Sequence, residues 1–305
     1  MISILIPTYN YSCRALVCDL QAQCARLQRS DSTFEYEILV ADDASTRPDV
    51  CKDNEQIARL EHCRYLPQPE NMGRSRIRNY LADQARYDYL LFLDSDAEVA
   101  DPHFLENYLR VLRTSGAEVI CGGVANIPSL KDPACSLRYY YEESVGEGRL
   151  ARERMKNPCA RFSTFNFLIR RALFLSIRFN ENFVHYGYED VFFGMEIKRR
   201  QVSILHIDNA MIHAGVEHND VFLAKTETAL RTLHSLGPEL QSFVTVSRTA
   251  LKLKRMGLLP VLAGLHRCFS SWVRRNLVSV RPSIFLFNLY KLGYYATLEC
   301  ASRKA

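Results

Sequence analysis

The first 125 residues alternate between short apolar segments and segments with helical periodicity, and this alternation restricts the possible folds more than any other feature. Apolar segments of strand length lie at 2–7, 36–43, 63–67, 89–96 and 117–124. Helical patterns lie between them at 14–29, 49–60, 71–85 and 102–113, and the third is expected to begin just after Gly73. Strands and helices in this order predict β-α-β units, and therefore a mainly parallel α/β sheet flanked by helices.

Three of the predicted strands run directly into polar clusters. The segment 2–7 is followed by Thr8-Tyr9-Asn10, the second strand ends at Asp42-Asp43, and the fourth ends at Asp94-Ser95-Asp96. Ligands of such sheets bind beyond the carboxyl ends of the strands. The three clusters, which are far apart in the sequence, are therefore predicted to converge on one edge of the sheet.

The pair Asp94 and Asp96 has two interpretations. Two carboxylates one residue apart at a strand end can hold a hard divalent cation, and such a cation can neutralise a diphosphate leaving group. A solvated acidic turn explains the same residues about equally well. His213, in the segment AMIHAG, becomes a third metal ligand only if it faces Asp96, and otherwise it is a packing residue.

Charged residues also stand at two predicted helix starts. Asn71 and Gly73 open a helix that carries Arg78. The free N–H groups of a helix start, together with arginines, suit an anionic ligand. An ordinary capped helix with a charged outer face explains most of the arginines equally well. Glu189 and Asp190 precede the apolar segment VFFGMEI. Helix capping accounts for these acids, and the same position suits a carboxylate that acts as a general base.

The charge distribution separates a C-terminal part. Residues 245–305 contain 11 Lys and Arg and one acidic residue, which gives a net charge of +10, whereas residues 1–244 carry −5. From residue 221 onward the pattern is helical, with aromatic residues among the basic ones. Basic amphipathic helices of this kind favour contact with an anionic membrane surface, and packing on the N-terminal part or on a second subunit is the alternative. We expect two parts, residues 1–218 and residues 219–305.

Five segments together resemble the family 2 glycosyltransferases, which are inverting enzymes of the GT-A fold. These are ISILIPTYN, ILVADDAS, NMGRSRIRN, LFLDSDAEV and GYEDVFFGMEI, in the order and at roughly the spacing of that family. The resemblance covers about residues 1–215 and is closest to enzymes of bacterial surface glycans. The QxxRW motif of the processive synthases is missing from the sequence, which favours an enzyme that adds a single sugar.

The resemblance implies a role for each matching residue. It assigns Asp190 as the catalytic base, Asp96 and His213 as ligands of Mn²⁺ or Mg²⁺, and Asn166 and Glu189 to the side of the acceptor or donor sugar. The residues that it assigns to the nucleotide are Pro7, Thr8, Tyr9, Asp42, Asn71, Gly73, Arg78, Asp94 and Ser95.

The expected function is transfer of a sugar from a nucleotide-sugar donor, a UDP-sugar above all, to a hydroxyl of a glycan or lipid-linked acceptor. A catalytically silent nucleotide- or glycan-binding protein of the same fold, or a nucleotidyltransferase, is the alternative. Nucleic acid is not an expected partner, because no recognition motif accompanies the basic residues. The ten cysteines show no CxxC pair, and MISILIPTYN is typical of a strand rather than an export signal. We therefore expect a cytoplasmic protein, peripheral on the inner face of the plasma membrane.

Overall fold

The computed structural model describes residues 1–183 and 186–301, and the chain divides into two compact units. The first unit consists of Met1–Ala125, Glu147–Asn182 and Phe193–Gly215, and the second of Asn126–Gly146, Phe183–Phe192 and Val216–Ala305. The division that the sequence predicts, between residues 218 and 219, stays a prediction.

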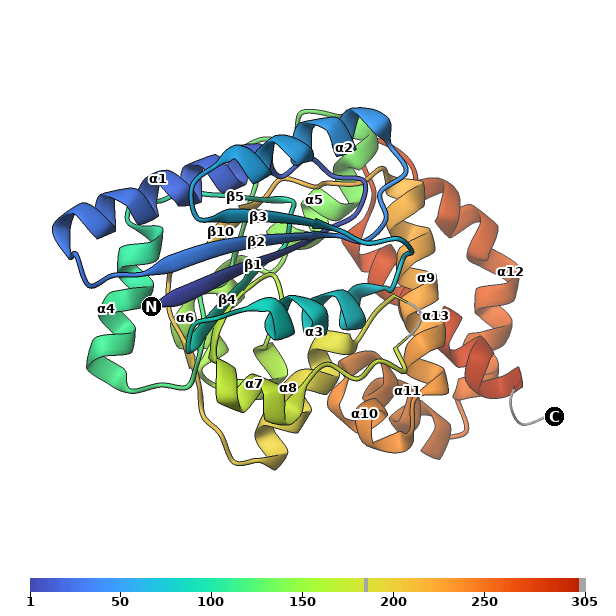
Figure 1. Cartoon of the computed structure of the whole chain (residues 1–305). Helices are drawn as coiled ribbons and strands as arrows, with labels where there is room; N and C mark the ends of the chain where they lie inside the picture. The colour runs from blue at the N-terminus through green and yellow to red at the C-terminus, as the bar shows by residue number, and fades with distance from the viewer. Residues whose placement is uncertain (184–185, 302–305) are drawn as a thin grey trace. The chain divides into compact units, whose positions relative to one another are not determined.

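A seven-stranded sheet of order β3-β2-β1-β4-β8-β6-β9 forms the centre of the first unit (Figure 1). Its strands are β1 (Ile2–Thr8), β2 (Tyr36–Asp42), β3 (Cys63–Pro67), β4 (Tyr89–Leu93), β6 (Val119–Cys121), β8 (Asn166–Arg170) and β9 (Ile204–His206). Four neighbouring pairs run parallel, and only β8 is antiparallel to its neighbours β4 and β6. The predicted mainly parallel sheet is confirmed, and the antiparallel strand lies beyond residue 125, where the alternation in the sequence ends.

A second, three-stranded sheet has the order β5-β10-β7. It contains β5 (Ala97–Glu98), β7 (Val124–Asn126) and β10 (Met211–His213). Strands β5 and β10 are antiparallel, with His213 opposite Ala97. Because β5 begins directly after Asp96, this register brings His213 to the carboxyl end of β4.

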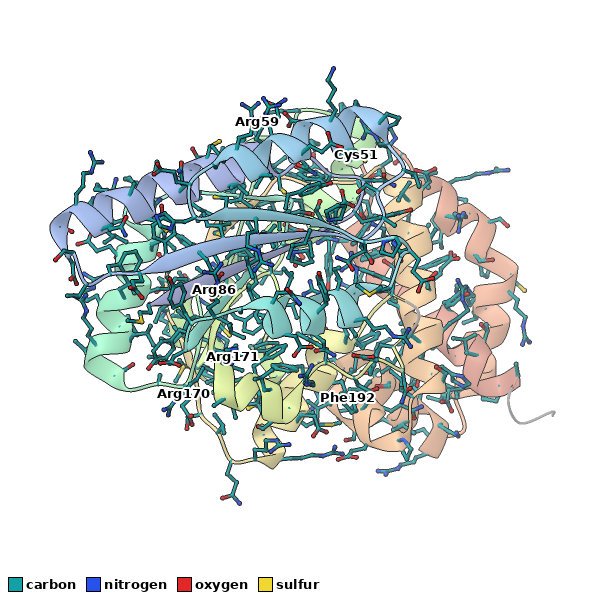
Figure 2. All side chains as sticks on the ribbon, viewed as in Figure 1. Cys51, Arg59, Arg86, Arg170, Arg171 and Phe192 are labelled. Atoms are coloured by element: carbon teal, nitrogen blue, oxygen red, sulfur yellow. The ribbon has the colours of Figure 1, made fainter. Side chains whose placement is uncertain are left out.

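Helices of the first unit lie on both faces of the large sheet (Figure 1). They are α1 (Arg14–Ser30), α2 (Pro48–Glu55), α3 (Arg74–Gln84), α4 (Phe104–Ser115), α6 (Ala151–Arg154), α7 (Arg171–Ile177) and α8 (Glu189–Arg199), the first turn of which belongs to the second unit. Alternate strand residues face opposite layers. Ile4 packs in the core that contains Leu20 of α1, whereas Leu5 packs in the core that contains Leu81 of α3. Side chains fill the space between the sheet and these helices (Figure 2).

The second unit is helical. It contains α5 (Ser136–Glu143), α9 (Asn219–Ser235), α10 (Pro238–Phe243), α11 (Thr245–Arg255), α12 (Leu259–Leu277) and α13 (Ile284–Ala301). Leu137, Leu223, Leu277 and Phe287 lie in its core. The predicted C-terminal helical extension is therefore confirmed, whereas the short helices α5 and α6 were not predicted. Among the described residues, no helix has the length and apolarity that crossing a bilayer requires.

Candidate active site

The loops that follow β1 and β2 are tied together at one edge of the sheet. The backbone N–H of Asp43 donates to the carbonyl of Thr8 at 2.9 Å, and that of Asn10 donates to the Ser45 hydroxyl at 2.7 Å. The Thr8 hydroxyl donates to the carbonyl of Tyr11 at 2.8 Å, which orders the loop itself. Pro7 is half-buried and Tyr9 is 50% exposed, so the ring of Tyr9 is available to a ligand.

Asp42, the last residue of β2, is held by hydrogen bonds on both carboxylate oxygens. The backbone N–H of Ser45 donates to Oδ1 at 2.8 Å, and the hydroxyl of Tyr65 donates to Oδ2. Burial, followed by this bond to Asp42, raises the pKa of Tyr65, so the phenol keeps its proton. Asp42 is buried, yet each carboxylate oxygen has a second lone pair with which it can accept a bond from a ligand.

Asp43 fixes the turn that opens α3. Its carboxylate accepts bonds from the backbone N–H groups of Met72 at 2.7 Å and Gly73 at 3.0 Å, while its carbonyl accepts one from the side-chain amide of Asn71 at 2.9 Å. Burial raises the pKa of Asp43, and the two backbone N–H groups act in the opposite direction. Gly73 has φ 82°, which favours glycine. The sequence predicted the turn, but the role of Asp43 in holding it was missed.

Arg78 lies beneath the end of β4 and pairs with the first aspartate of the Asp-Ser-Asp segment. Its guanidinium donates to Asp94 Oδ1 at 2.6 Å, and the Arg78 side chain is only 3% exposed. A buried arginine in such a pair gives the carboxylate a fixed orientation. The structure thus brings together two residues that the sequence assigned to the nucleotide. Ser95, the next residue, is half-buried.

His213 and Asp96 meet at the same strand end. Nε2 of His213 lies 3.2 Å from Oδ2 of Asp96, and the imidazole is 7% exposed beside the ring of Phe165. The charge of Asp96 also acts on Tyr11: burial raises the pKa of the Tyr11 phenol, and the negative charge of Asp96 raises it further.

The Asp96 and His213 pair fits a divalent metal. Neighbouring ligand atoms at 2.1 Å from an octahedral cation lie about 3 Å apart, close to the observed separation. Gly215 leaves the space that the carboxylate occupies, because a Cβ atom on it would lie 2.4 Å from Asp96 Oδ2. His213, which the sequence offered as a third ligand on condition that it faces Asp96, does face it, and its role in metal binding stays a prediction.

Asn166 is enclosed by the protein. Its Oδ1 accepts a bond from the hydroxyl of Tyr108 at 2.7 Å, and its Nδ2 donates to the carbonyls of Gly123 and Asn209 at 3.1 and 2.9 Å. The side chain is buried, and these bonds hold β8 to the loops around it. Its predicted place on the sugar side stays a prediction.

Glu189 and Asp190 open α8 in the second unit. Oε2 of Glu189 accepts a bond from the backbone N–H of Gly187 at 3.1 Å, and Oδ1 of Asp190 accepts one from Val191 at 2.7 Å. Gly187 has φ 112°, and a Cβ atom there would collide with Ala229. The geometry confirms the sharp turn and the helix start, while the catalytic role of Asp190 stays a prediction.

Comparison with known proteins identifies the family. Residues 3–178 match the model of Glycosyl transferase family 2. The chain is 24% identical over 242 residues to chondroitin synthase of Escherichia coli, a match that covers 70% of this chain and 34% of that protein, so the chain spans about a third of that relative's length.

Two solved structures share the fold over 99% of this chain. TarS 1-349 of S. aureus in complex with UDP-GlcNAc is 17% identical, with a TM-score of 0.53 over 91% of its length. The mannosyltransferase PcManGT of Pyrobaculum calidifontis, in complex with GDP-Man and Mn²⁺, is 12% identical, with a TM-score of 0.54 over 86%. The architecture is thus the GT-A α/β fold, and the family match over more than half of the chain shows that this protein belongs to glycosyl transferase family 2.

Proposed function

We propose that this protein is an inverting, metal-dependent glycosyltransferase that moves a sugar from a UDP-sugar to a hydroxyl of a glycan or lipid-linked acceptor. The contact between Asp96 and His213 at the carboxyl end of β4 carries this proposal. A carboxylate and an imidazole side by side suit a divalent cation, and they lie at the strand end where the family is expected to hold the diphosphate.

The donor is proposed from the residues around this strand end. The structures that share the fold were solved with UDP-GlcNAc and with GDP-Man, both of which are nucleoside diphosphate sugars. In the ordered loop at Thr8 and Tyr9 the Thr8 hydroxyl can still accept a bond, as can the buried carboxylate of Asp42. At the α3 turn that Gly73 allows, the side-chain amide of Asn71 has a second N–H besides the one that bonds to Asp43. Pro7, Ser95 and the Arg78–Asp94 pair complete the proposed nucleotide site.

Asp96 and His213 are the proposed ligands of Mn²⁺ or Mg²⁺. When bound, the cation supplies positive charge that stabilises the diphosphate as it leaves. His213 would hold such a cation only as the neutral imidazole, through the lone pair of Nε2. The missing side chain of Gly215 leaves room for the Asp96 carboxylate beside His213.

Asp190 is the proposed general base. It takes the proton of the acceptor hydroxyl while that oxygen attacks the anomeric carbon and the bond to the diphosphate breaks. One displacement of this kind inverts the anomeric centre and forms no covalent intermediate with the enzyme. Asp190 stands in the first turn of α8, where the helix dipole favours the ionised carboxylate.

The acceptor side is assigned to Glu189 and Asn166, following the family resemblance. Glu189 is buried at the start of α8 and orders the Gly187 turn, so its contribution to the acceptor is made through the position of that turn. A cytoplasmic location is proposed from the ten dispersed cysteines, because a thiol-rich chain suits a reducing compartment.

Release of nucleoside diphosphate from a panel of UDP-, GDP- and dTDP-sugars tests the function. The full chain is incubated with each donor, with and without Mn²⁺, in the presence of glycan and lipid-linked acceptors. Release from a UDP-sugar that requires both the metal and an acceptor supports the proposal. A folded sample that neither binds nor consumes any donor contradicts it and favours a silent protein of this fold.

A further inference from the structure

Helix α12 has an apolar stripe on its exposed side. Leu258, Val261, Leu265, Phe269 and Trp272 are spaced by three or four residues, which places all five within an arc of about 80° of the helix circumference. Their side chains are between 44% and 62% exposed. The stripe begins at the N-cap residue of α12 and extends for about four turns along it.

The opposite side of α12 is packed within the second unit. Ala263, Val273 and Leu277 are buried, and the ring of His266 stacks edge-on against Tyr290 with 4.9 Å between the centroids. Gly293 of α13 lets the helices approach, because a Cβ atom there would lie 2.7 Å from His266 Nδ1. Figure 1 shows α12 running beside α13. Packing against α13 therefore explains why the inner face of α12 is buried, and the apolar stripe lies on the outer face.

Basic side chains stand at both ends of the stripe. Lys252 and Arg255 lie in the last turn of α11, just before α12, while Arg275 and Arg281 lie at and beyond its C-terminal end. All four are exposed, and none has an ion-pair partner within the described parts of the chain. Helix α12 contains no Asp or Glu. An apolar band between exposed positive charges therefore characterises this surface.

We propose that this α12 surface docks the protein on a lipid bilayer that carries anionic headgroups. A helix with an apolar stripe and basic flanks lies in the plane of the interface, with the stripe among the acyl chains and the cations at the phosphates. Trp272, the single tryptophan of the chain, has the amphipathic ring that prefers this depth. The charge argues against a second copy of the chain as the occupant, because two such surfaces would bring like charges together.

Membrane docking through α12 does not depend on the proposed sugar transfer, so an experiment can contradict either proposal without affecting the other. Because the chain has one tryptophan and it lies in the stripe, intrinsic fluorescence reports directly on the surface. The full chain is titrated with vesicles of phosphatidylcholine alone and with vesicles that also contain phosphatidylglycerol. We expect a blue shift of the emission and co-sedimentation with the phosphatidylglycerol vesicles alone, and both weaken as the ionic strength rises.

Variants separate the two components of the surface. Leu265→Glu in the stripe and the double change Arg275→Glu with Arg281→Glu are each expected to lower partitioning into anionic vesicles by about tenfold or more. Val221→Glu is the matched control, because Val221 is 44% exposed on α9 of the same unit, and it is expected to bind like the wild type. Circular dichroism shows whether each variant is folded, and UDP binding shows whether the nucleotide site is intact.

Three results would overturn the proposal. Equal binding to both kinds of vesicle would show that anionic headgroups are not recognised. An emission that stays unshifted with phosphatidylglycerol vesicles would show that the stripe does not enter the bilayer. A blue shift that depends on protein concentration without vesicles, together with a dimer in sedimentation, would assign the stripe to an interface between copies of the chain.

Discussion

Nε2 of His213 lies 3.2 Å from Oδ2 of Asp96, although 117 positions separate the two residues in the sequence. The antiparallel pairing of β5 with β10 accounts for this contact, because it sets His213 opposite Ala97, the residue that follows Asp96. The backbone N–H of Ala214 also donates to the carbonyl of Asp96 at 2.9 Å, which anchors the end of β10. A two-residue strand thus positions the proposed metal ligands.

Substitution Gly215→Ala is expected to weaken Mn²⁺ binding without unfolding the protein. The new Cβ atom would lie 2.4 Å from Oδ2 and 2.6 Å from Cβ of Asp96, so the whole Asp96 side chain must shift from its place beside His213. Displacing a ligand in this way costs about 10–100-fold in metal affinity. Calorimetric titration with Mn²⁺ in the presence of UDP measures the effect. Gly264→Ala is the control, because nothing lies within 4 Å of the Cβ position there. An unchanged Mn²⁺ affinity in Gly215→Ala would contradict the assignment of Asp96 as a metal ligand.

Substitution Asp190→Asn is expected to abolish transfer while UDP affinity stays nearly unchanged. The amide cannot accept the proton of the acceptor hydroxyl, and the loss of a general base lowers kcat by about 10²–10⁴-fold. Glu196→Gln on the same helix is the matched control, since Glu196 pairs with Arg199 and is expected to be dispensable. Normal transfer by Asp190→Asn, or loss of UDP binding, would show that the base is assigned to the wrong residue.

Stability is expected to fall in mild acid because of His206. Burial lowers the pKa of His206 to about 4, and the neighbouring Arg154 guanidinium adds to this effect. The unfolded chain therefore takes up a proton near pH 6.5, before the folded chain does. The contribution of neutral His206 to the free energy of unfolding is complete above about pH 6.5. It is lost as the pH falls toward 4, and the free energy of unfolding then decreases by up to about 1.4 kcal/mol per pH unit.

Thermal unfolding of the wild type and of His206→Asn between about pH 7.5 and 5 measures this contribution. The midpoint of the wild type should fall more steeply with decreasing pH than that of the variant. His103→Asn, at an exposed histidine, is the control and should keep the slope of the wild type. Parallel curves for the wild type and His206→Asn would show that His206 does not stay neutral in the folded protein.

Local patterns in the sequence were sufficient to predict the parallel half of the sheet and the start of α3. Each depends on residues close together in the chain, such as an apolar strand followed by a polar residue or Gly73 before a helical period. The convergence of the β1 and β2 loops followed from topology alone, because parallel neighbours end at the same edge. The bond between Asp43 and Thr8 bears this out.

Contacts that depend on pairing between distant parts of the chain could not be predicted from those local patterns. The antiparallel course of β8 and the hydrogen bonds of Asn166 arise from strands that are distant in the sequence. The sequence assigned Arg78 to the nucleotide, but only the fold shows that its side chain is buried in an ion pair with Asp94. The adjacent acid at Asp43 was visible in the sequence, but only the fold shows that it holds the α3 turn.

The measurement that tests the central claim most directly is the thermal shift produced by UDP, GDP and dTDP, with and without Mn²⁺, on the wild type and on Asp96→Ala. Asp49→Ala, which removes an exposed carboxylate on α2, is the control. We predict that UDP stabilises the wild type and the control only with Mn²⁺, and that Asp96→Ala loses this shift. Stabilisation that is equal in Asp96→Ala, or absent for every nucleotide in a folded sample, would contradict a metal-diphosphate site at the end of β4.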